Sequence, residues 1–433
     1  MPLPLAELLS PALLDRLFAR IDQRSEEMVA LARDLVRVPT VNPPGDAYTQ
    51  CAELIGNRLR QRGFIVGYRR GEGTQGDSDR YPRTNVIARV EGRGRGPCVH
   101  FNGHIDVVAP GHGWTVDPFA GVVKDGRLYG RGSCDMKGGL AAAIVATEAI
   151  IDERIPFNGA IEISGTVDEE TGGFGGVAYL ARQGLFSRPR VDHVIIPEPL
   201  QVDRVCLGHR GVWWAEIEMR GRIGHGSMPF LGISAIRGMG DFLGLVEREL
   251  YPKLDQRQTR MPVEPPGARH STLNWNLIHG GLDEGYEGVP SPLVADSCRL
   301  VLDRRFLIEE NLDQVKAEVI ELLERVKRQR AGLGYTIKDI VVFHPTMADP
   351  EAPVVRALDE SITRVLGRVA THIASPGTYD QKHVARIGHL QDCVAYGPGR
   401  LELAHQPDEY VDIAEMVASA KIMAAAALRL LAA

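Results

Sequence analysis

The segment from Cys98 to Gly139 constrains the fold more than any other part of the chain. An apolar run ends in His104-Ile105-Asp106, and after a polar loop the turn GRGSCDMKGG (130–139) opens an Ala-rich helical stretch. This order predicts a strand that carries a histidine and a carboxylate to its C-terminal end, and then a glycine-rich turn that places Asp135 at a helix start. Because ligands of open α/β sheets bind at that edge, we expect the segment to form half of a metal site.

Strands and helices alternate along the first 208 residues. Apolar runs that are typical of strands lie at 64–68, 85–90, 99–105, 160–167 and 191–196. Between them, apolar residues recur at helical spacing at 11–37, 47–62, 137–151 and 175–183. Such alternation predicts a mostly parallel α/β layer.

The pattern changes near residue 209. Apolar and polar residues alternate as in half-buried strands at 212–219, 272–278, 297–302 and 335–343, and helices are expected at 233–249 and 309–328. Antiparallel strands with two helices indicate an inserted α+β domain. After residue 345 the chain returns to the first layer and ends in a helix at 411–431. We therefore predict an α/β fold with a main domain of residues 1–208 and 346–433 and an inserted domain of residues 209–345.

Composition and charge exclude several classes of function. A chain of 433 residues is long enough for two domains, and its formal charge of −6 gives no electrostatic case for binding nucleic acid. The six cysteines form no C-x-x-C pair, which favours reduced thiols in a cytosol. The start of the chain lacks a signal-peptide pattern, and no apolar run approaches the ~20 residues needed to cross a membrane. We expect a cytoplasmic protein without membrane or nucleic-acid partners.

Seven residues are candidates for metal chemistry. The possible ligands are His104, Asp135, Glu170, Glu198 and His405, and the acids that would serve them are Asp106 and Glu169. Each has an ordinary alternative: a histidine satisfied in the core, an N-cap aspartate, a solvated acidic turn, an exposed turn between prolines, or a loop histidine near a helix cap formed by Asp408 or Glu409. Together, however, they converge on one edge of the predicted sheet.

The spacing of these residues suggests their roles. His104 and Asp106 are two apart, so on a strand they share a face and the carboxylate can hold the imidazole. The three consecutive acids at 168–170 repel one another unless cations neutralise them. One glutamate would then bind metal while its neighbour acts as a general base. A carboxylate that bridges two ions, each completed by a histidine and a glutamate, gives a two-metal site suited to Zn²⁺, with Co²⁺ or Mn²⁺ as substitutes.

Motifs that span nearly the whole chain match a known family. The sequence resembles the two-zinc amidohydrolases that include acetylornithine deacetylase, succinyl-diaminopimelate desuccinylase, aminoacylase and glutamate carboxypeptidase. The matching motifs, in the family's order, are LVRVPTVNPPG (35–45), GHIDVV (103–108), GRGSCDMKGG (130–139), DEETGG (168–173), PEP (197–199), GHGSMP (224–229), DRR (303–305), GTYD (377–380) and HQPDEYV (405–411).

The resemblance implies a role for each candidate. One zinc is expected on His104, Asp135 and Glu198, and the other on Asp135, Glu170 and His405, with Asp135 bridging. Glu169 would be the general base and acid, and Asp106 would orient His104. The inserted domain would be a lid and dimerisation domain, whose His225 stabilises the oxyanion in the partner's active site. Residues expected to bind substrate are Arg305, His209, Arg210, Gly377 and Thr378.

Two departures concern the side that recognises the substrate. Desuccinylases tend to have two successive arginines where this chain has His209-Arg210, and the family's Asn-x-Val/Ile-Pro turn is replaced by Glu287-Gly288-Val289-Pro290. We therefore expect a dimeric zinc enzyme that hydrolyses the amide bond of an N-acyl amino acid or a related small N-acyl amine. The alternatives are a dipeptidase or carboxypeptidase, an N-formyl-aminopyrimidine deformylase, and a non-catalytic metal-binding relative.

Overall fold

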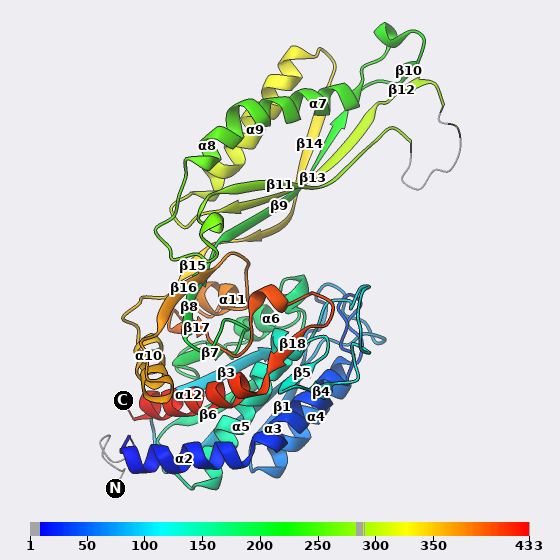
Figure 1. Cartoon of the computed structure of the whole chain (residues 1–433). Helices are drawn as coiled ribbons and strands as arrows, with labels where there is room; N and C mark the ends of the chain where they lie inside the picture. The colour runs from blue at the N-terminus through cyan, green and yellow to red at the C-terminus, as the bar shows by residue number, and fades with distance from the viewer. Residues whose placement is uncertain (1–8, 283–288, 290, 433) are drawn as a thin grey trace. The chain divides into compact units, whose positions relative to one another are not determined.

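The computed structural model describes residues 9–282, 289 and 291–432, and it divides the chain into two compact units (Figure 1). Unit 1 contains the described residues up to Gly208, Ala348–Ile373 and those from Tyr379 onward, whereas unit 2 contains His209–Met347 and Ala374–Thr378. The chain thus re-enters unit 1 at Ala348 rather than at residue 346. The segment Ala374–Thr378, which holds Gly377 and Thr378, belongs to unit 2.

A mixed sheet with a parallel centre forms the middle of unit 1. Its strands run in the order β1-β2-β6-β3-β7-β17-β8, and the pairs β6/β3, β3/β7 and β7/β17 are parallel. The bounds are β1 (Ile65–Arg70), β2 (Thr84–Glu91), β3 (Cys98–His104), β6 (Ala160–Thr166), β7 (His193–Ile196), β8 (Arg204–His209) and β17 (Cys393–Ala395). The chain passes between the units at β8, β15 (Thr346–Met347) and β16 (Thr371–Ser375).

Helices cover both faces of this sheet. On one face Leu140 of α5 packs against Gly103 of β3, where an added Cβ would lie 3.0 Å from its side chain. His100 points to the opposite face, because strand residues alternate, and its ring stacks on Phe186 at 4.6 Å. The helices of unit 1 are α2 (Pro11–Gln23), α3 (Ser25–Val36), α4 (Tyr48–Gln61), α5 (Gly138–Asp152), α6 (Val177–Arg182), α10 (Pro353–Leu366), α11 (Gln381–Arg386) and α12 (Ile413–Leu431).

A small sheet ties the end of the chain to the loop before the glycine-rich turn. β18 (Tyr410–Asp412) pairs with β5 (Arg127–Tyr129), which pairs with β4 (Val122–Lys124). The predicted helix over 11–37 is two helices, since α2 ends at Gln23 and α3 begins at Ser25. None of the helices in the described part of the chain combines the length and apolar character that a membrane crossing requires.

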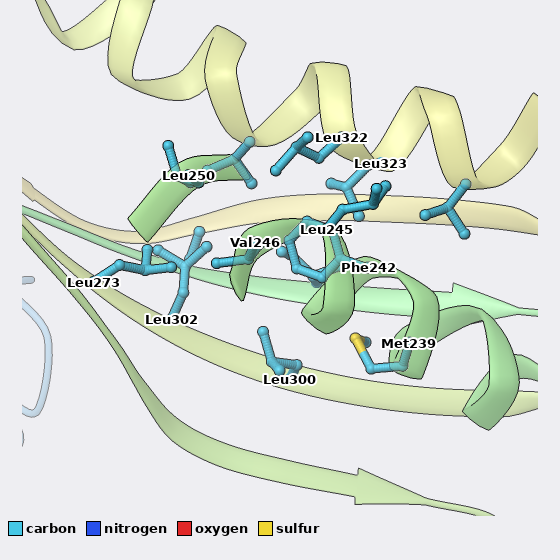
Figure 2. Packing of buried hydrophobic residues seen from close by; sticks show 14 of the residues in the cluster. Met239, Phe242, Leu245, Val246, Leu250, Leu273, Leu300, Leu302, Leu322 and Leu323 are labelled. Atoms are coloured by element: carbon cyan, nitrogen blue, oxygen red, sulfur yellow. The ribbon is translucent and has the colours of Figure 1, made fainter. Parts of the chain in front are cut away.

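Unit 2 has a sheet and a core of its own. Its antiparallel strands run in the order β11 (Thr272–Gly280), β13 (Ser297–Phe306), β9 (Gly211–Arg220) and β14 (Gly334–Phe343). Helices α7 (Ala235–Leu245), α8 (Tyr251–Asp255) and α9 (Leu312–Gln329) pack on it. Figure 2 shows residues of α7 and α9, such as Phe242 and Leu323, in one apolar cluster with Leu300 and Leu302 of β13. The predicted fold class is therefore confirmed: a mostly parallel α/β layer with a separate antiparallel α+β part.

Candidate metal centre

The five predicted ligands meet at the C-terminal edge of the parallel strands in unit 1. His104 is the last residue of β3, Glu170 follows β6 and Glu198 follows β7, while Asp135 and His405 come from a turn and a loop. Among the described residues, two groups have ligand atoms within 4.8 Å of one another: His104 with Asp135 and Glu198, and Asp135 with Glu170 and His405. Asp135 belongs to both groups.

The two carboxylate oxygens of Asp135 face different histidines. Its Oδ1 lies 3.0 Å from His104 Nε2, and its Oδ2 lies 3.5 Å from His405 Nε2. Glu198 Oε1 is 4.0 Å from the first imidazole, and Glu170 Oε2 is 3.1 Å from the second. A carboxylate between two histidine–glutamate pairs has the geometry of a bridging ligand, and imidazole and carboxylate donors are those that divalent transition metals bind.

The charges of this cluster also call for cations. Burial raises the pKa of Glu170 to about 7, and burial together with the charge of Asp135 raises the pKa of Glu198 well above its usual value. Three carboxylates that share one buried site cannot all ionise at low cost unless positive charge is present. Bound metal ions would supply that charge, so the residues fit the metals that the sequence suggests.

A buried carboxylate holds the turn that carries Asp135. Glu409, which is 1% exposed, accepts the backbone N–H groups of Gly132, Cys134 and Asp135 with Oε1 at 2.9, 3.0 and 3.1 Å. Its Oε2 is 2.5 Å from Arg131 Nη1. One alternative was that Glu409 caps the last helix, and its carboxylate does not do so. In the sequence, its actual role is marked by an acid four residues after His405.

Asp408 does not cap the last helix either. Its Oδ1 and Oδ2 accept the backbone N–H and the hydroxyl of Thr115 at 2.8 and 2.9 Å. The helix α12 begins later, at Ile413. Asp408 thus fastens the loop that carries His405 to the polar loop after β3.

Asp106 supports the acidic turn more closely than it supports His104. Its Oδ1 and Oδ2 accept the backbone N–H groups of Glu169 and Glu170, each at 3.1 Å. The Nδ1 atom of His104 is 3.0 Å from the main-chain oxygen of Asp106 and 3.6 Å from its carboxylate. The imidazole is thus held by the backbone carbonyl, which still leaves Nε2 toward Asp135.

Three consecutive acids are tolerated because each has a separate partner. Asp168 accepts from Arg83 Nε at 3.2 Å and from Tyr48 Oη at 3.1 Å. Glu169 Oε1 is 2.8 Å from Lys382 Nζ, and the next acid, Glu170, faces His405. Sequence reasoning did not single out Lys382; the signal was a basic residue two positions after the GTYD motif.

The predicted substrate-binding residues and His225 all lie in unit 2. His225 is exposed on β10 (Gly224–His225), which pairs with β12 (Leu293–Val294), and its Nδ1 accepts from Ser227 Oγ at 2.7 Å. Arg305 makes a two-point ion pair with Asp303 at 2.7 and 3.0 Å. His209 is buried, and its Nδ1 N–H donates to the carbonyl of Arg210 at 2.8 Å.

Arg210 brings two of the predicted substrate segments together within unit 2. Its Nε donates to the carbonyl of Pro376 at 3.2 Å and its Nη1 to the carbonyl of His270 at 3.0 Å. Gly377 and Thr378 directly follow Pro376 in the chain. In the turn at 287–290, which differs from the Asn-x-Val/Ile-Pro pattern, residues 287, 288 and 290 lie outside the described residues.

Comparisons with known proteins show which family this sequence matches. A family model described as peptidase family M20/M25/M40 matches residues 100–429. Succinyl-diaminopimelate desuccinylase from Methylobacterium radiotolerans is 30% identical over 89% of this chain and 92% of its own. Acetylornithine deacetylase from Photorhabdus laumondii is also 30% identical, over 91% and 95%. A deformylase from Bacillus subtilis, which acts on N-formyl-4-amino-5-aminomethyl-2-methylpyrimidine, is 28% identical over 93% and 94%.

Solved structures share the fold across both units. Human carnosine dipeptidase 1 superposes with a TM-score of 0.76 and 21% identity, over 97% of this chain and 99% of the other. The curated relatives have deacylase names, so the prediction of an amide-hydrolysing enzyme is confirmed at the level of the family. Because the family model spans most of the sequence and the candidate metal ligands lie within it, the chain belongs to peptidase family M20/M25/M40 and is a metallohydrolase.

Proposed function

We propose that this protein hydrolyses the amide bond of an N-acyl amino acid or a related small N-acyl amine at a two-metal centre. The observation that carries the proposal is the placement of Asp135 between His104 and His405, each beside a further glutamate. Deacylase names among relatives that match about nine-tenths of the chain support the acyl-amide substrate.

The metals would be two zinc ions. His104, Asp135 and Glu198 would hold one, and Asp135, Glu170 and His405 would hold the other. Co²⁺ and Mn²⁺ are substitutes that the same nitrogen and oxygen donors accommodate. When bound, such ions supply Lewis acidity, which polarises a carbonyl oxygen and makes water easier to deprotonate.

Glu169 would move the proton. Its carboxylate takes a proton from the attacking water and returns it to the nitrogen that leaves when the amide bond breaks. Asp106 accepts the backbone N–H of this residue, so the main chain that carries the base is held in place. A base that is already oriented does not have to be ordered at the moment of reaction, and this lowers the barrier.

Unit 2 would bind the substrate and would complete the active site of a second subunit. We assign His225 to the oxyanion of a partner's active site in a homodimer, in keeping with its exposed position. Arg305 and Arg210 would supply positive charge for a substrate carboxylate, with His209, Gly377 and Thr378 beside them. Arg210 suits this role because it is held by the segment that leads into Gly377.

The enzyme would act in the cytoplasm on a small molecule. All six cysteines are free and buried, which agrees with a reducing compartment. Nucleic acid and membranes are not partners in this proposal.

A substrate panel with metal analysis tests the function. N-acetyl, N-formyl and N-succinyl amino acids, dipeptides and N-formyl-aminopyrimidine should be incubated with purified protein of known metal content. Turnover of N-acyl amino acids with two metals per chain is expected. Turnover of dipeptides alone would favour the dipeptidase, turnover of the formylated pyrimidine alone would favour the deformylase, and metal without turnover would favour a non-catalytic relative.

Two variants test the catalytic assignments. Glu169→Ala should keep both metals and lose roughly 10²–10⁴-fold in kcat, and surviving turnover would remove Glu169 from the mechanism. His225→Ala should also keep its metals and lose kcat. If His225 acts on the partner's site, mixing the two inactive variants should restore about a quarter of the wild-type activity, because half of randomly mixed dimers are hybrids with one complete site.

A further inference from the structure

Lys382 contacts the proposed base but belongs to none of the roles assigned so far. Its Nζ lies 2.8 Å from Glu169 Oε1, and the two side chains are only 3% and 11% exposed. Burying such an ion pair removes two charges from water, which costs several kcal/mol per ion before the attraction is counted. Burial of the Lys382–Glu169 pair is therefore weak evidence that it stabilises the fold. Because the lysine lies beside the proposed base, a role in catalysis is the better explanation.

The first turn of α11 is fastened to the sheet beneath Lys382. Gln381 Nε2 donates to the carbonyls of Leu207 and Cys393 at 2.9 and 2.6 Å. Asp380 accepts from Asn102 Nδ2 at 3.3 Å. The backbone on the N-terminal side of Lys382 is thus tied to β3, β8 and β17.

The same turn is tied to the acidic turn that carries Glu169. His383 Nε2 donates to the carbonyl of Gly172 at 2.6 Å, and Lys382 makes the ion pair one residue earlier. Two consecutive side chains of α11 therefore hold the segment around residues 169–172. Because Asp106 holds the backbone N–H of Glu169 at 3.1 Å, the main chain of the base is fixed independently of Lys382.

We propose that Lys382 is the positioning residue for Glu169, directing the proton transfers of the proposed amide hydrolysis to Oε2 by holding Oε1. This inference rests on the proposed function. A carboxylate whose main chain is fixed can still rotate about its side-chain bonds, and a charged hydrogen bond to one oxygen removes that freedom. The other oxygen is then presented in one orientation throughout turnover.

The charge of Lys382 persists at neutral pH. Burial lowers its pKa, but the negative charges of Glu169 and Asp380 raise it by more, so that the pKa lies above its ordinary value. The ammonium group therefore remains a donor of the same kind before and after the reaction, and the proton that Glu169 carries from the water to the leaving nitrogen does not pass to Lys382.

Substitution at residue 382 gives the first test. Lys382→Met should keep the wild-type metal content and a KM within about threefold, while kcat falls roughly 100-fold, the range expected when a general base is lost in part. Lys382→Arg, which restores a charged donor, should recover kcat to within about tenfold of wild type. The control Lys421→Met removes a surface lysine that pairs with Asp22 at 2.7 Å and should leave kcat unchanged. A Lys382→Met enzyme with full kcat would overturn the proposal.

A double variant shows whether Lys382 acts through Glu169. Adding Lys382→Met to Glu169→Ala should cause no further loss of the residual kcat, because the group to be positioned is already gone. A further loss as large as in the wild-type background would overturn the proposal, since Lys382 would then act elsewhere. If Lys382→Met does not fold, Lys382→Gln serves in its place, as it also removes the charge.

A crystal structure of the Lys382→Met protein separates this inference from the proposed function. The Glu169 carboxylate should leave its wild-type position while the five ligand side chains stay in place. An unchanged carboxylate would sink the positioning role even in an active enzyme. If instead the wild-type protein hydrolysed no amide, the proposed function would fail, whereas the displaced carboxylate would still be observed.

Discussion

Glu409 accepts the backbone N–H of Asp135 at 3.1 Å, although 274 positions separate the two residues in the sequence. The same oxygen accepts two further N–H groups of the glycine-rich turn. The loop that delivers His405 therefore also fixes the carboxylate that faces both histidines. One buried side chain thus couples the two halves of the metal centre, which come from different parts of the chain.

Replacing Glu409 should weaken metal binding. Glu409→Gln loses the negative charge that faces Arg131, and its NH2 end cannot accept a hydrogen bond, so either Arg131 or the three backbone N–H groups lose their acceptor. We expect metal affinity to fall about 10–100-fold, as is typical when a residue that supports a ligand is changed. Competition with a chromophoric chelator measures the affinity. Glu402→Gln, an exposed acid in the same loop, is the control, and equal affinities in both variants would refute the role of Glu409.

Replacing Asp106 should disturb Glu169 and Glu170 more than it disturbs His104. In Asp106→Asn, one of the two N–H groups of Glu169 and Glu170 would face an amide nitrogen instead of an oxygen, and two donors cannot bond to each other. We expect lower kcat and weaker binding of the metal held by Glu170 and His405, with the other metal retained. Calorimetric titration of the metal-free protein resolves the two affinities. Selective loss at His104 would show instead that the carboxylate acts on that imidazole.

The candidate ligands can be picked out from the sequence because strand ends and motif order both mark them. His104, Glu170 and Glu198 each follow an apolar strand, and parallel strands bring their C-terminal ends to one edge. The fold class followed from the same alternation. The residues that support the candidate ligands and the base are harder to predict. Glu409 and Lys382 reach their partners only because β18 pairs with β5 and α11 packs on the sheet.

The sequence also contains a pattern of polar residues that lie buried in β3, and the predictions did not use this pattern. β3 is buried throughout, yet polar residues occupy every second position, at His100, Asn102 and His104. In the parallel register they lie beside Glu162, Ser164 and Thr166 of β6. Ser164 Oγ donates to Asn102 Oδ1 at 2.7 Å and pairs with His100 Nε2 at the same distance. Such a polar face becomes recognisable only when the register of the two strands is known.

The two histidines should release metal at different rates. The side chain of His405 is 48% exposed, whereas that of His104 is 2% exposed. A chelator should therefore remove one metal equivalent quickly from the His405 side and the second slowly. His405→Ala should bind one equivalent with near wild-type affinity, and His112→Ala, at an exposed loop histidine, should bind both. Release of both equivalents in a single phase would argue against independent exposure of the two positions.

A charge cluster in unit 2 should make its stability depend on pH. Glu310 Oε1 lies 2.7 Å from Arg304 Nη2 and 2.9 Å from Arg257 Nη1, and its Oε2 accepts the backbone N–H of Leu307 at 2.7 Å. Burial alone would raise the pKa of Glu310, but Arg304 and these donors lower it below the ordinary value. An acid with a lowered folded-state pKa adds stability above the unfolded-state pKa and loses it as pH falls through the folded value.

Glu310→Gln should therefore destabilise unit 2 at pH 7 by about 3 kcal/mol, the cost of leaving a buried arginine unpaired, and the difference from wild type should shrink below about pH 4. Urea unfolding followed by tryptophan fluorescence measures this, because Trp213, Trp214 and Trp275 all lie in unit 2. Glu321→Gln, at an exposed position of α9, should change little at either pH. If the Glu310→Gln deficit were the same at pH 7 and pH 3.5, the ionised carboxylate would not be its source.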